Sequence, residues 1–422
     1  MSKKLIAFVA ILAICSGYSF AAVENLKVGG SIDTYAVNRS DYDLGVHAAT
    51  GLDDGITALA SITKLKFFAD LTEEVNANIV VKYEHLFGAS AVDRFYVPVA
   101  FVTLKDILDS PLTLKIGKQK IVLGSGLLIS KSTTNQTTSG LSPYNAALLG
   151  DLNPGSTFAG ITGVIDLSPA TITLGYVKIT EGATAVHNDT NLYLVNLNYD
   201  LEDIVESTSA DLYYVGKNTQ GKAAAQDDVK NVGVRVVSSA LENLTLSGEF
   251  CYQFAKEDGM RADNKIRSDT AIELAATYAL QDMEWNPTIG IDYTLISENW
   301  DPMYEGQTPA NIANALFPNT NVAAAGLTLT AQPREDISLK LRYVNLKLVE
   351  EIIGLGNDYC AAYAINTDKK ALGDEIDLAI AYDYTEDVQL GLNLDYFNPG
   401  SVFADTNDEA ATQLLGTMKV SF

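Results

Sequence analysis

The sequence predicts an all-β protein, a transmembrane antiparallel up-and-down β-barrel of about eighteen strands with short periplasmic turns and long extracellular loops. Three observations predict this fold class. Apolar and polar residues alternate from Leu26 to Phe422, the connections are alternately short and long, and no later stretch resembles a transmembrane helix. Alternation gives each strand one apolar and one polar face. Because open sheet edges cannot exist in lipid, such strands fit a closed barrel with lipid outside and water inside.

The first residues predict export. Lys3 and Lys4 precede the apolar stretch Leu5–Ile14, and Ser19–Ala21 forms a small-residue cleavage site. We therefore expect a signal peptide at 1–21, removed after export through the Sec pathway, and a barrel at 22–422. A lipoprotein anchor at Cys15 is the alternative, but the bulky Ile14 before it disfavours that site.

The alternation defines the strands in order. In Asn243–Phe254, one parity carries Leu246 and Phe250, and the other carries Ser247 and Glu249. The same pattern predicts strands at 24–37, 60–70, 76–87, 96–105, 111–119, 156–166, 170–180, 190–200, 208–216, 228–238, 243–256, 267–280, 286–297, 322–331, 336–348, 374–385, 387–397 and 410–422.

Aromatic residues near the strand ends predict girdles at the membrane interfaces, where amphipathic rings suit the headgroup level. The last strand alternates to a terminal Phe422, which predicts recognition by the barrel-assembly machinery. The predicted girdle residues are Tyr83, Tyr176, Tyr193, Tyr199, Tyr252, Tyr278, Tyr343, Tyr384 and Phe397.

The polar parities predict which side chains line the pore. Both signs of charge occur in similar numbers, so the lumen should orient polar solutes and set ion preference, although plain solvation of the inner face is the alternative. The basic candidates are Lys27, Lys82, Lys115, Arg235, Arg267, Lys340, Arg342 and Lys419. The acidic candidates are Asp33, Glu84, Glu249, Asp269, Glu273, Asp292, Asp377, Asp383 and Asp395. An interior filled by large apolar residues, as in a plugged barrel, is not expected from these parities.

Two long connections should fold inward. Lys120–Gly155 carries apolar Leu127–Ile129, which predicts that this loop enters the barrel and narrows it. Ala310–Phe317 should form a short helix covering the mouth. The net charge of −24 is expected to reside mostly in the extracellular loops. Such acids would favour solvation, with cation bridging to lipopolysaccharide as a sharper hypothesis.

The chain resembles bacterial outer-membrane porins of the alginate-export type, which are similar to eighteen-stranded substrate-specific channels. The resemblance is carried by Leu112–Gln119 continuing into Ile121–Ile129, by Thr157–Leu167 and Thr171–Thr180, and by Glu242–Phe250. It implies a barrel and a channel function. Where such proteins often have Gly-Arg-Gln, this chain has Gly117, Lys118 and Gln119, and a mixed lumen replaces the strongly basic one of the alginate exporter.

These features predict an outer-membrane channel for small hydrophilic solutes or ions, with saccharides or organic anions as candidate preferences. The alternative is an exporter or importer of an anionic polysaccharide, and an outer-membrane enzyme is less favoured because His47, His85 and His187 lack a serine motif beside them. We expect no catalytic residues, cofactor, metal or nucleic-acid partner. The expected partners are the lipid bilayer, lipopolysaccharide and solutes, in a monomer or homotrimer. Cys251 and Cys360 predict no disulfide framework.

Overall fold

The computed structural model describes residues 25–45, 55–88, 93–131, 152, 155–181, 189–219, 226–258, 266–307, 309–352 and 363–422. At positions 226–227, 255–258 and 266–267 it describes the backbone alone. The predicted signal peptide and the loop residue Cys360 lie outside these ranges.

All eighteen predicted strands are confirmed, most with ends shifted by no more than a few residues. They are β1 (Asn25–Ser40), β2 (Ile56–Asp70), β3 (Val75–Leu86), β4 (Arg94–Leu104), β5 (Leu112–Lys120), β6 (Thr157–Asp166), β7 (Ala170–Thr180), β8 (Thr190–Asp200), β9 (Thr208–Thr219), β10 (Gln226–Leu241), β11 (Leu244–Asp258), β12 (Ile266–Ala279), β13 (Thr288–Ile296), β14 (Val322–Arg334), β15 (Ile337–Leu348), β16 (Ala371–Thr385), β17 (Val388–Pro399) and β18 (Ala411–Ser421). The short helices are η2 (Ile107–Asp109) and α3 (Ala313–Leu316). No helix in the described ranges is long and apolar enough to cross a bilayer.

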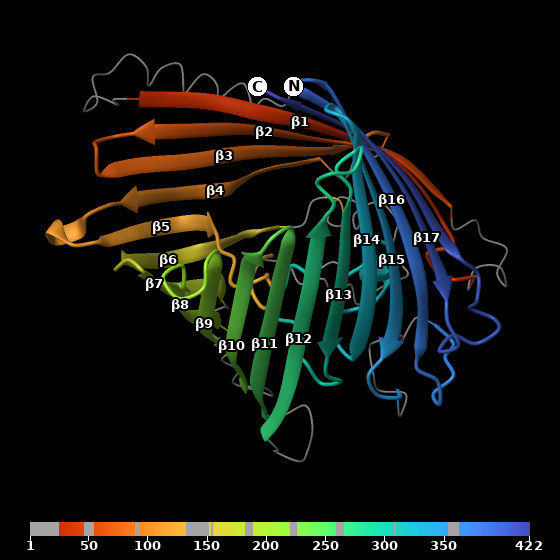
Figure 1. Cartoon of the computed structure of the whole chain (residues 1–422). Helices are drawn as coiled ribbons and strands as arrows, with labels where there is room; N and C mark the ends of the chain where they lie inside the picture. The colour runs from red at the N-terminus through yellow and green to blue at the C-terminus, as the bar shows by residue number, and fades with distance from the viewer. Residues whose placement is uncertain are drawn as a thin grey trace.

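Every strand pairs antiparallel with its sequence neighbours, and β1 also pairs with β18. The sheet is therefore a closed up-and-down barrel, in which the first and last strands lie side by side (Figure 1). At this closing seam, the Gly30 N–H donates to the Phe422 carbonyl at 2.8 Å, and the Phe422 N–H donates to the Gly30 carbonyl at 3.1 Å. Closure leaves no strand edge facing lipid.

The two faces of the barrel differ in chemistry as alternation requires. On β11, Phe250 is 43% exposed on the outer face, while the adjacent Glu249 on the inner face is only 4% exposed. The same parity exposes Leu390, Leu392 and Leu394 of β17. One girdle prediction is wrong: Phe397 shares the inner parity of Asp395 and is fully buried. It packs inward because the end of β17 lies beneath an infolded loop.

The two ends of the barrel carry different connections. The start of β1, the end of β18 and the short turns share one end, here called the turn end, and the long connections share the other, the loop end (Figure 1). The expectation that the acids lie mostly in the loops is too narrow, because the turns are acidic as well. Acids in the turns are Glu73, Glu74, Asp106, Asp109, Glu202, Asp203, Glu206, Glu242, Asp282, Glu284, Glu335, Asp336, Glu386 and Asp387.

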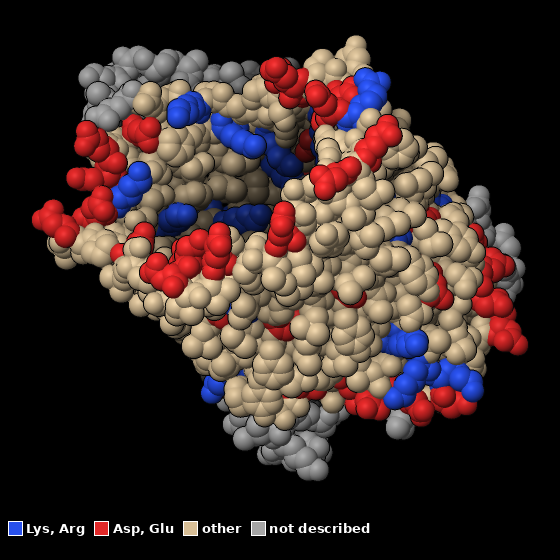
Figure 2. Space-filling view, in the orientation of Figure 1, with Lys and Arg blue, Asp and Glu red and all other residues tan. Residues whose placement is uncertain are grey.

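The hollow of the barrel is visible from outside. Figure 2 shows a deep recess beside β2–β5 in which Lys and Arg side chains gather, with Asp and Glu side chains around the rim. The register places Lys64 of β2 opposite Lys82 of β3, and Thr103 of β4 opposite Lys115 of β5. The inner face of these strands is therefore rich in lysine.

The inner face near the loop end is apolar, which differs from the expectation of a polar interior throughout. On β15, Arg342 is followed on the same parity by Val344, Leu346 and Leu348, all of them buried. These side chains join loop residues in one inner apolar cluster, because infolded loops cover them and exclude water. The cluster includes Leu127, Leu128, Ile129, Phe158, Leu192, Leu194, Val215, Trp300, Met303, Leu316, Phe317, Val344, Leu346, Phe397 and Phe403.

The closing seam predicts a packing constraint at Gly30. A Cβ atom there would lie 2.6 Å from the Lys64 carbonyl oxygen and 2.6 Å from the Phe422 ring. We expect Gly30→Val to destabilise the barrel by about 1–3 kcal/mol through overpacking. The measurement is the temperature at which the folded band in detergent gels converts to the unfolded band.

Gly416→Ala is the matched control in the same seam, because a Cβ atom there would meet Ala36 at an ordinary 3.8 Å. Equal melting temperatures for the two variants would contradict the constraint.

Candidate functional site

The first inner loop, residues 121–131, lies inside the barrel, as predicted for the start of Lys120–Gly155. Gly124 has a positive φ of +57°, and a Cβ atom there would lie 2.4 Å from Glu249 Oε1, so the chain passes close to β11. The Ser125 N–H donates to Glu249 Oε2 at 2.7 Å, and the Ser125 hydroxyl donates to Glu273 of β12. Leu127 and Leu128 then bury themselves in the inner apolar cluster. Residues 132–151 and 153–154 of the predicted loop lie outside the described residues.

The second inner loop, described at residues 297–307 and 309–321, extends along the inner face from β9 to β17. At one side, Lys217 of β9 pairs with Asp301, and Gln253 of β11 donates to the Asp301 carbonyl at 2.9 Å. At the other side, Asn311 Nδ2 donates to Asp395 of β17 at 3.0 Å. Helix α3 lies within the predicted range Ala310–Phe317.

Backbone hydrogen bonds join the two inner loops to each other. The Tyr304 N–H donates to the Leu128 carbonyl at 3.0 Å, and the Gly306 N–H donates to the Gly126 carbonyl at 2.8 Å. Ser130 donates to the Tyr304 carbonyl at 2.7 Å. The two loops therefore form one layer that occupies part of the interior.

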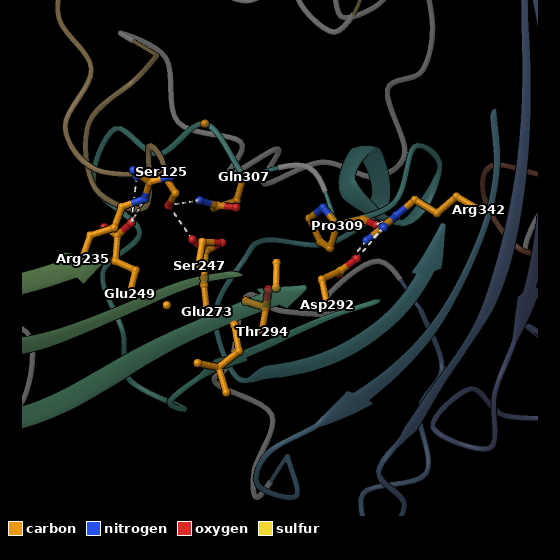
Figure 3. A pocket seen from close by; sticks show the side chains of 14 residues that line it. Ser125, Arg235, Ser247, Glu249, Glu273, Asp292, Thr294, Gln307, Pro309 and Arg342 are labelled. Atoms are coloured by element: carbon orange, nitrogen blue, oxygen red, sulfur yellow. Dashed lines mark hydrogen bonds and ion pairs between the residues drawn. The ribbon is translucent and has the colours of Figure 1, made fainter. Parts of the chain in front are cut away.

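A cavity of about 340 Å³ separates this layer from the inner face of β10–β15. Figure 3 shows two polar groups beside it, one around Ser125 and the other formed by Asp292 and Arg342. The residues that line it are Ser125, Arg235, Ser247, Gly248, Glu249, Glu273, Leu274, Ala275, Asp292, Thr294, Gly306, Gln307, Pro309 and Arg342.

In the group around Ser125, the two acids Glu249 and Glu273 share the cavity with one arginine, Arg235. Tyr213 donates its hydroxyl to Glu249 Oε1 at 2.5 Å, and Arg235 Nε lies 3.5 Å from Glu249 Oε2. Gln307 Nε2 donates to the Ser125 hydroxyl at 3.1 Å. Glu249 therefore accepts hydrogen bonds from both the barrel and the first inner loop.

Arg342 fixes the second inner loop to the barrel. Its two terminal nitrogens donate to Asp292 of β13 at 2.7 and 2.8 Å, and its Nε donates to the Pro309 carbonyl at 3.0 Å. The fork geometry of a guanidinium suits this bidentate pairing. Asp292 thus neutralises the charge of Arg342, while Arg342 also binds the second inner loop.

The structure brings several of the predicted lumen residues into ion pairs with neighbouring side chains. Asp33 lies 3.0 Å from Lys64, and Lys82 lies 3.1 Å from Glu84. Glu84 also accepts a hydrogen bond from Tyr96 at 2.7 Å. These pairs lie on β1–β4, away from the cavity that Glu249, Glu273 and Asp292 line.

The other predicted residues are distributed over the length of the barrel. Lys27 Nζ lies 5.9 Å from the ring centre of Phe68, and Asp383 accepts from Gln389 at 2.8 Å near the turn end. Lys115 occupies β5 opposite Thr103. Asp269 lies near the Asn299 backbone N–H, and Lys340 and Asp377 line a neighbouring cavity. Asp395 accepts a hydrogen bond from Asn311 of that cavity, and Lys419 lies beside Asp383. Arg267 is on β12, and its side chain is not described.

Sequence parity missed several residues of the interior. Lys64 and Lys66 share a parity with Ala60 and Ile62, so an apolar stretch concealed their inward direction. The inward direction of Glu375 could have been predicted, because it lies two residues before Asp377 and so shares its face of β16. Tyr213 had the signal of strand parity, because it shares one face of β9 with Asp211 and Val215. Ser125 had none, since its position depends on the folding of a loop onto a distant strand.

The histidine and cysteine side chains outside the cavity pack against their neighbours. His85 lies on the outer face, stacked on Tyr83 and edge-on to Phe87, with its Nδ1 2.6 Å from Asp93. Cys251 is a buried free thiol. Within the described ranges, no group of three or more His, Cys, Asp or Glu side chains could hold a metal ion.

Glu305 is a buried acid in the second inner loop. Its two carboxyl oxygens accept hydrogen bonds from Asn319 Nδ2 at 2.9 and 3.0 Å. Burial raises the pKa of Glu305 to about 8, and the Asn319 hydrogen bonds oppose that rise. The folded loop therefore favours the protonated carboxyl.

Loss of the Glu249 carboxylate should release the first inner loop. We expect Glu249→Ala to accelerate hydrogen exchange at the Ser125 amide about tenfold or more, because a charged acceptor is removed. Asp383→Ala, on the same inner face near the turn end, is the control. Unchanged exchange at Ser125 in the Glu249 variant would contradict the assigned contact.

The protonation of Glu305 predicts how the second inner loop responds to pH. A carboxyl whose folded-state pKa exceeds its unfolded value of 4.5 stabilises the folded loop at low pH, and that stability falls as the pH rises through about 8. Amide protection of residues 297–321, corrected for intrinsic exchange, should decrease between about pH 5 and pH 9. Glu305→Gln should remove this dependence, and a decrease that persists in the variant would assign it to another group.

The comparisons with known proteins agree with this architecture. Residues 24–417 match the family model described as alginate export. Pseudomonas aeruginosa OccD3 (OpdP) superposes with a TM-score of 0.60 at 14% identity, covering 96% of this chain and 93% of that chain. P. aeruginosa OprD gives 0.60 at 12% identity, covering 95% of each chain. Acinetobacter baumannii OccAB4 gives 0.57 at 13% identity, covering 96% of this chain and 100% of that one.

No curated protein sequence matches the chain. The structural likenesses support the fold, and the family match spans nearly the whole sequence. The chain belongs to the alginate export family.

Proposed function

We propose that the protein is an outer-membrane channel through which small hydrophilic solutes or ions diffuse passively. The observation that carries this proposal is a closed eighteen-stranded barrel with an apolar outer face and charged cavities inside. An apolar exterior suits lipid, and barrels of about sixteen to eighteen strands leave room for an aqueous path. Diffusion through such a path needs neither a cofactor nor a catalytic residue. The predicted pore-lining residues supply its charges.

A channel dedicated to an anionic polysaccharide is the second candidate. It is favoured by the family match and by the lysines on the inner face of β1–β5. Two of these lysines, Lys64 and Lys82, lie beside carboxylates, however. The nearby strands β16 and β17, which β18 separates from β1, carry Asp377 and Asp395. This mixture of signs supports small solutes over a long polyanion.

The remaining partners follow from the membrane setting. We infer that the outer face contacts lipid and lipopolysaccharide, and that Phe422 is recognised by the assembly machinery during insertion. Export through the Sec pathway by the leader 1–21 is part of the same proposal. A monomer and a homotrimer both fit this barrel, and cross-linking in membranes would separate them.

Single-channel recording in planar bilayers tests the channel directly. The purified protein should give discrete ohmic current steps in KCl, because a wetted lumen conducts ions without a carrier cycle. If protein whose gel shift shows that it is folded gives no current steps, the proposed function is contradicted.

Lys340 should contribute to ion selectivity. It lies on the inner face of β15, and we expect Lys340→Glu to raise the cation-to-anion permeability ratio about twofold or more. Reversal potentials in a KCl gradient measure this ratio. Lys347→Glu is the control on the same strand but the opposite face, and a similar shift in both variants would contradict the inward assignment.

A further inference from the structure

The register of β5, β6 and β7 places two lysines in one row on the outer face of the barrel. Lys118 of β5 lies opposite Ala159 of β6, and Ala159 lies opposite Lys178 of β7. Ala159 is exposed, whereas its chain neighbour Phe158 is buried inside the barrel. Because residues that oppose each other in a sheet share a face, both lysines point outward from three strands that lie side by side (Figure 1).

This row lies at the boundary between the apolar outer face and the loop end. Two residues nearer the turns, the same register aligns Ile116, Ile161 and Tyr176, all exposed on the outer face. Lys120, the last residue of β5, follows Lys118 on the same face toward the loop end. Lysines beside an apolar band extend their ammonium groups to the headgroup level of a bilayer.

Lys118 also marks the point where the pairing of β4 with β5 ends. The register of these two strands ends at the pair Ala100–Lys118, although β4 continues to Arg94. Beyond that pair, Lys118 Nζ donates to the Val97 carbonyl at 3.5 Å. A hydrogen bond of this length is weak, so the ammonium can exchange it for a stronger acceptor.

The charges of Lys118 and Lys120 are not neutralised by the protein. In the part of the chain that the structure describes, no ion pair joins either lysine to a carboxylate. Lys178, by contrast, pairs with Glu181 and Asp189, each at 2.7 Å. The end of β5 therefore presents two open positive charges to the surroundings of the barrel.

The spacing of these two cations suits a phosphate group. Residues i and i+2 of a strand lie about 6.6 Å apart on one face, and each lysine carries its ammonium on a flexible four-carbon stem. A phosphate offers several charged acceptor oxygens, so two ammonium groups can donate to it together. Lys118 and Lys120 can therefore converge on one phosphate.

The surroundings of the two lysines favour a lipid as the source of that phosphate. A ligand beside them lies over Ile116, Ile161 and Tyr176, so it gains contacts when it carries acyl chains as well as a charged group. The long connections of outer-membrane barrels face the outside of the cell. The lipid of that leaflet is lipopolysaccharide, whose lipid A part carries phosphates at the headgroup level.

We propose that Lys118 and Lys120 bind a phosphate of lipopolysaccharide on the outer face of β5. The proposal rests on the outer-membrane setting of the proposed function and goes beyond it by naming a site and its ligand. The ammonium groups bind the phosphate while Ile116, Ile161 and Tyr176 contact the acyl chains. Binding replaces the weak contact of Lys118 with the Val97 carbonyl by a charge-assisted hydrogen bond.

Lipid titrations of the unmodified protein test the chemistry of the ligand. Native mass spectrometry in detergent compares diphosphorylated lipid A with the same lipid A after enzymatic removal of its phosphates. We expect the phosphorylated lipid to bind at least about tenfold more tightly, because it alone offers charged acceptors. Equal affinities would overturn the proposal. Inorganic phosphate at about 10 mM should leave lipid A bound, because it lacks acyl chains, and displacement would overturn the lipid assignment.

A double substitution locates the site. Lys118→Gln with Lys120→Gln should weaken the binding of diphosphorylated lipid A about tenfold or more. The control, Lys66→Gln with Lys115→Gln, removes the same charge from the inner face and should leave the affinity unchanged. Unchanged affinity in the first variant, or an equal loss in the control, would overturn the assignment.

The heat-dependent gel shift shows whether each variant is folded. Lys120→Gln alone, at an exposed strand end, should weaken binding about threefold and provides the same test if the double variant does not fold.

Recording in planar bilayers separates this proposal from the channel function. Lipid A binding that depends on the two lysines, without current steps, would contradict the channel while supporting the site. Current steps together with lipid A binding that is insensitive to both lysines would contradict the site while leaving the channel intact.

Discussion

Backbone amide and carbonyl groups find no water inside a hydrocarbon layer, so each must pair within the protein. This constraint shapes the whole molecule. It requires β1 to meet β18 and places Phe422 against Gly30 at the seam. Once the sheet is closed, the inner faces of all strands converge on one interior, and every later feature follows from how that interior is filled.

The interior is filled by charge pairing as much as by apolar packing. Arg342 holds Asp292 and the Pro309 carbonyl, Glu375 holds the start of α3, and Glu249 holds the Ser125 amide. In each case a strand residue satisfies a loop whose backbone would otherwise be buried without partners. These charges therefore position the inner loops, whereas the lysines on the inner face of β2–β5 lie away from them.

The strands and the closed sheet could be predicted from the sequence, because a period of two is a direct consequence of strand geometry. The two inner loops could be predicted only in part. The apolar Leu127 and Leu128 predict that the first inner loop is buried, but nothing in the sequence indicates that Ser125 contacts Glu249. Such contacts join distant segments and depend on the closed barrel.

Sequence reasoning fails where the physical environment of the inner face changes along a strand. Phe397 is expected in a girdle because it is aromatic and near a strand end, but it shares the inner parity of Asp395 and packs against Phe317 with ring centres 5.8 Å apart. Alternation does not predict an inward Lys64, because the apolar Ala60 and Ile62 share its face of β2. A single polar-or-apolar label for a whole face cannot describe a strand that passes from an aqueous region to an apolar one.

The inner apolar cluster has a consequence for how this protein can vary over evolution. At the loop end of β15, Val344 and Leu346 pack inside the apolar cluster, so the inner side of the strand does not tolerate a polar replacement. Nearer the turns, the inner positions face an aqueous hollow and are free to change. Relatives that carry different solutes should therefore diverge mainly in the inward residues of that half, whereas the opposite half drifts slowly.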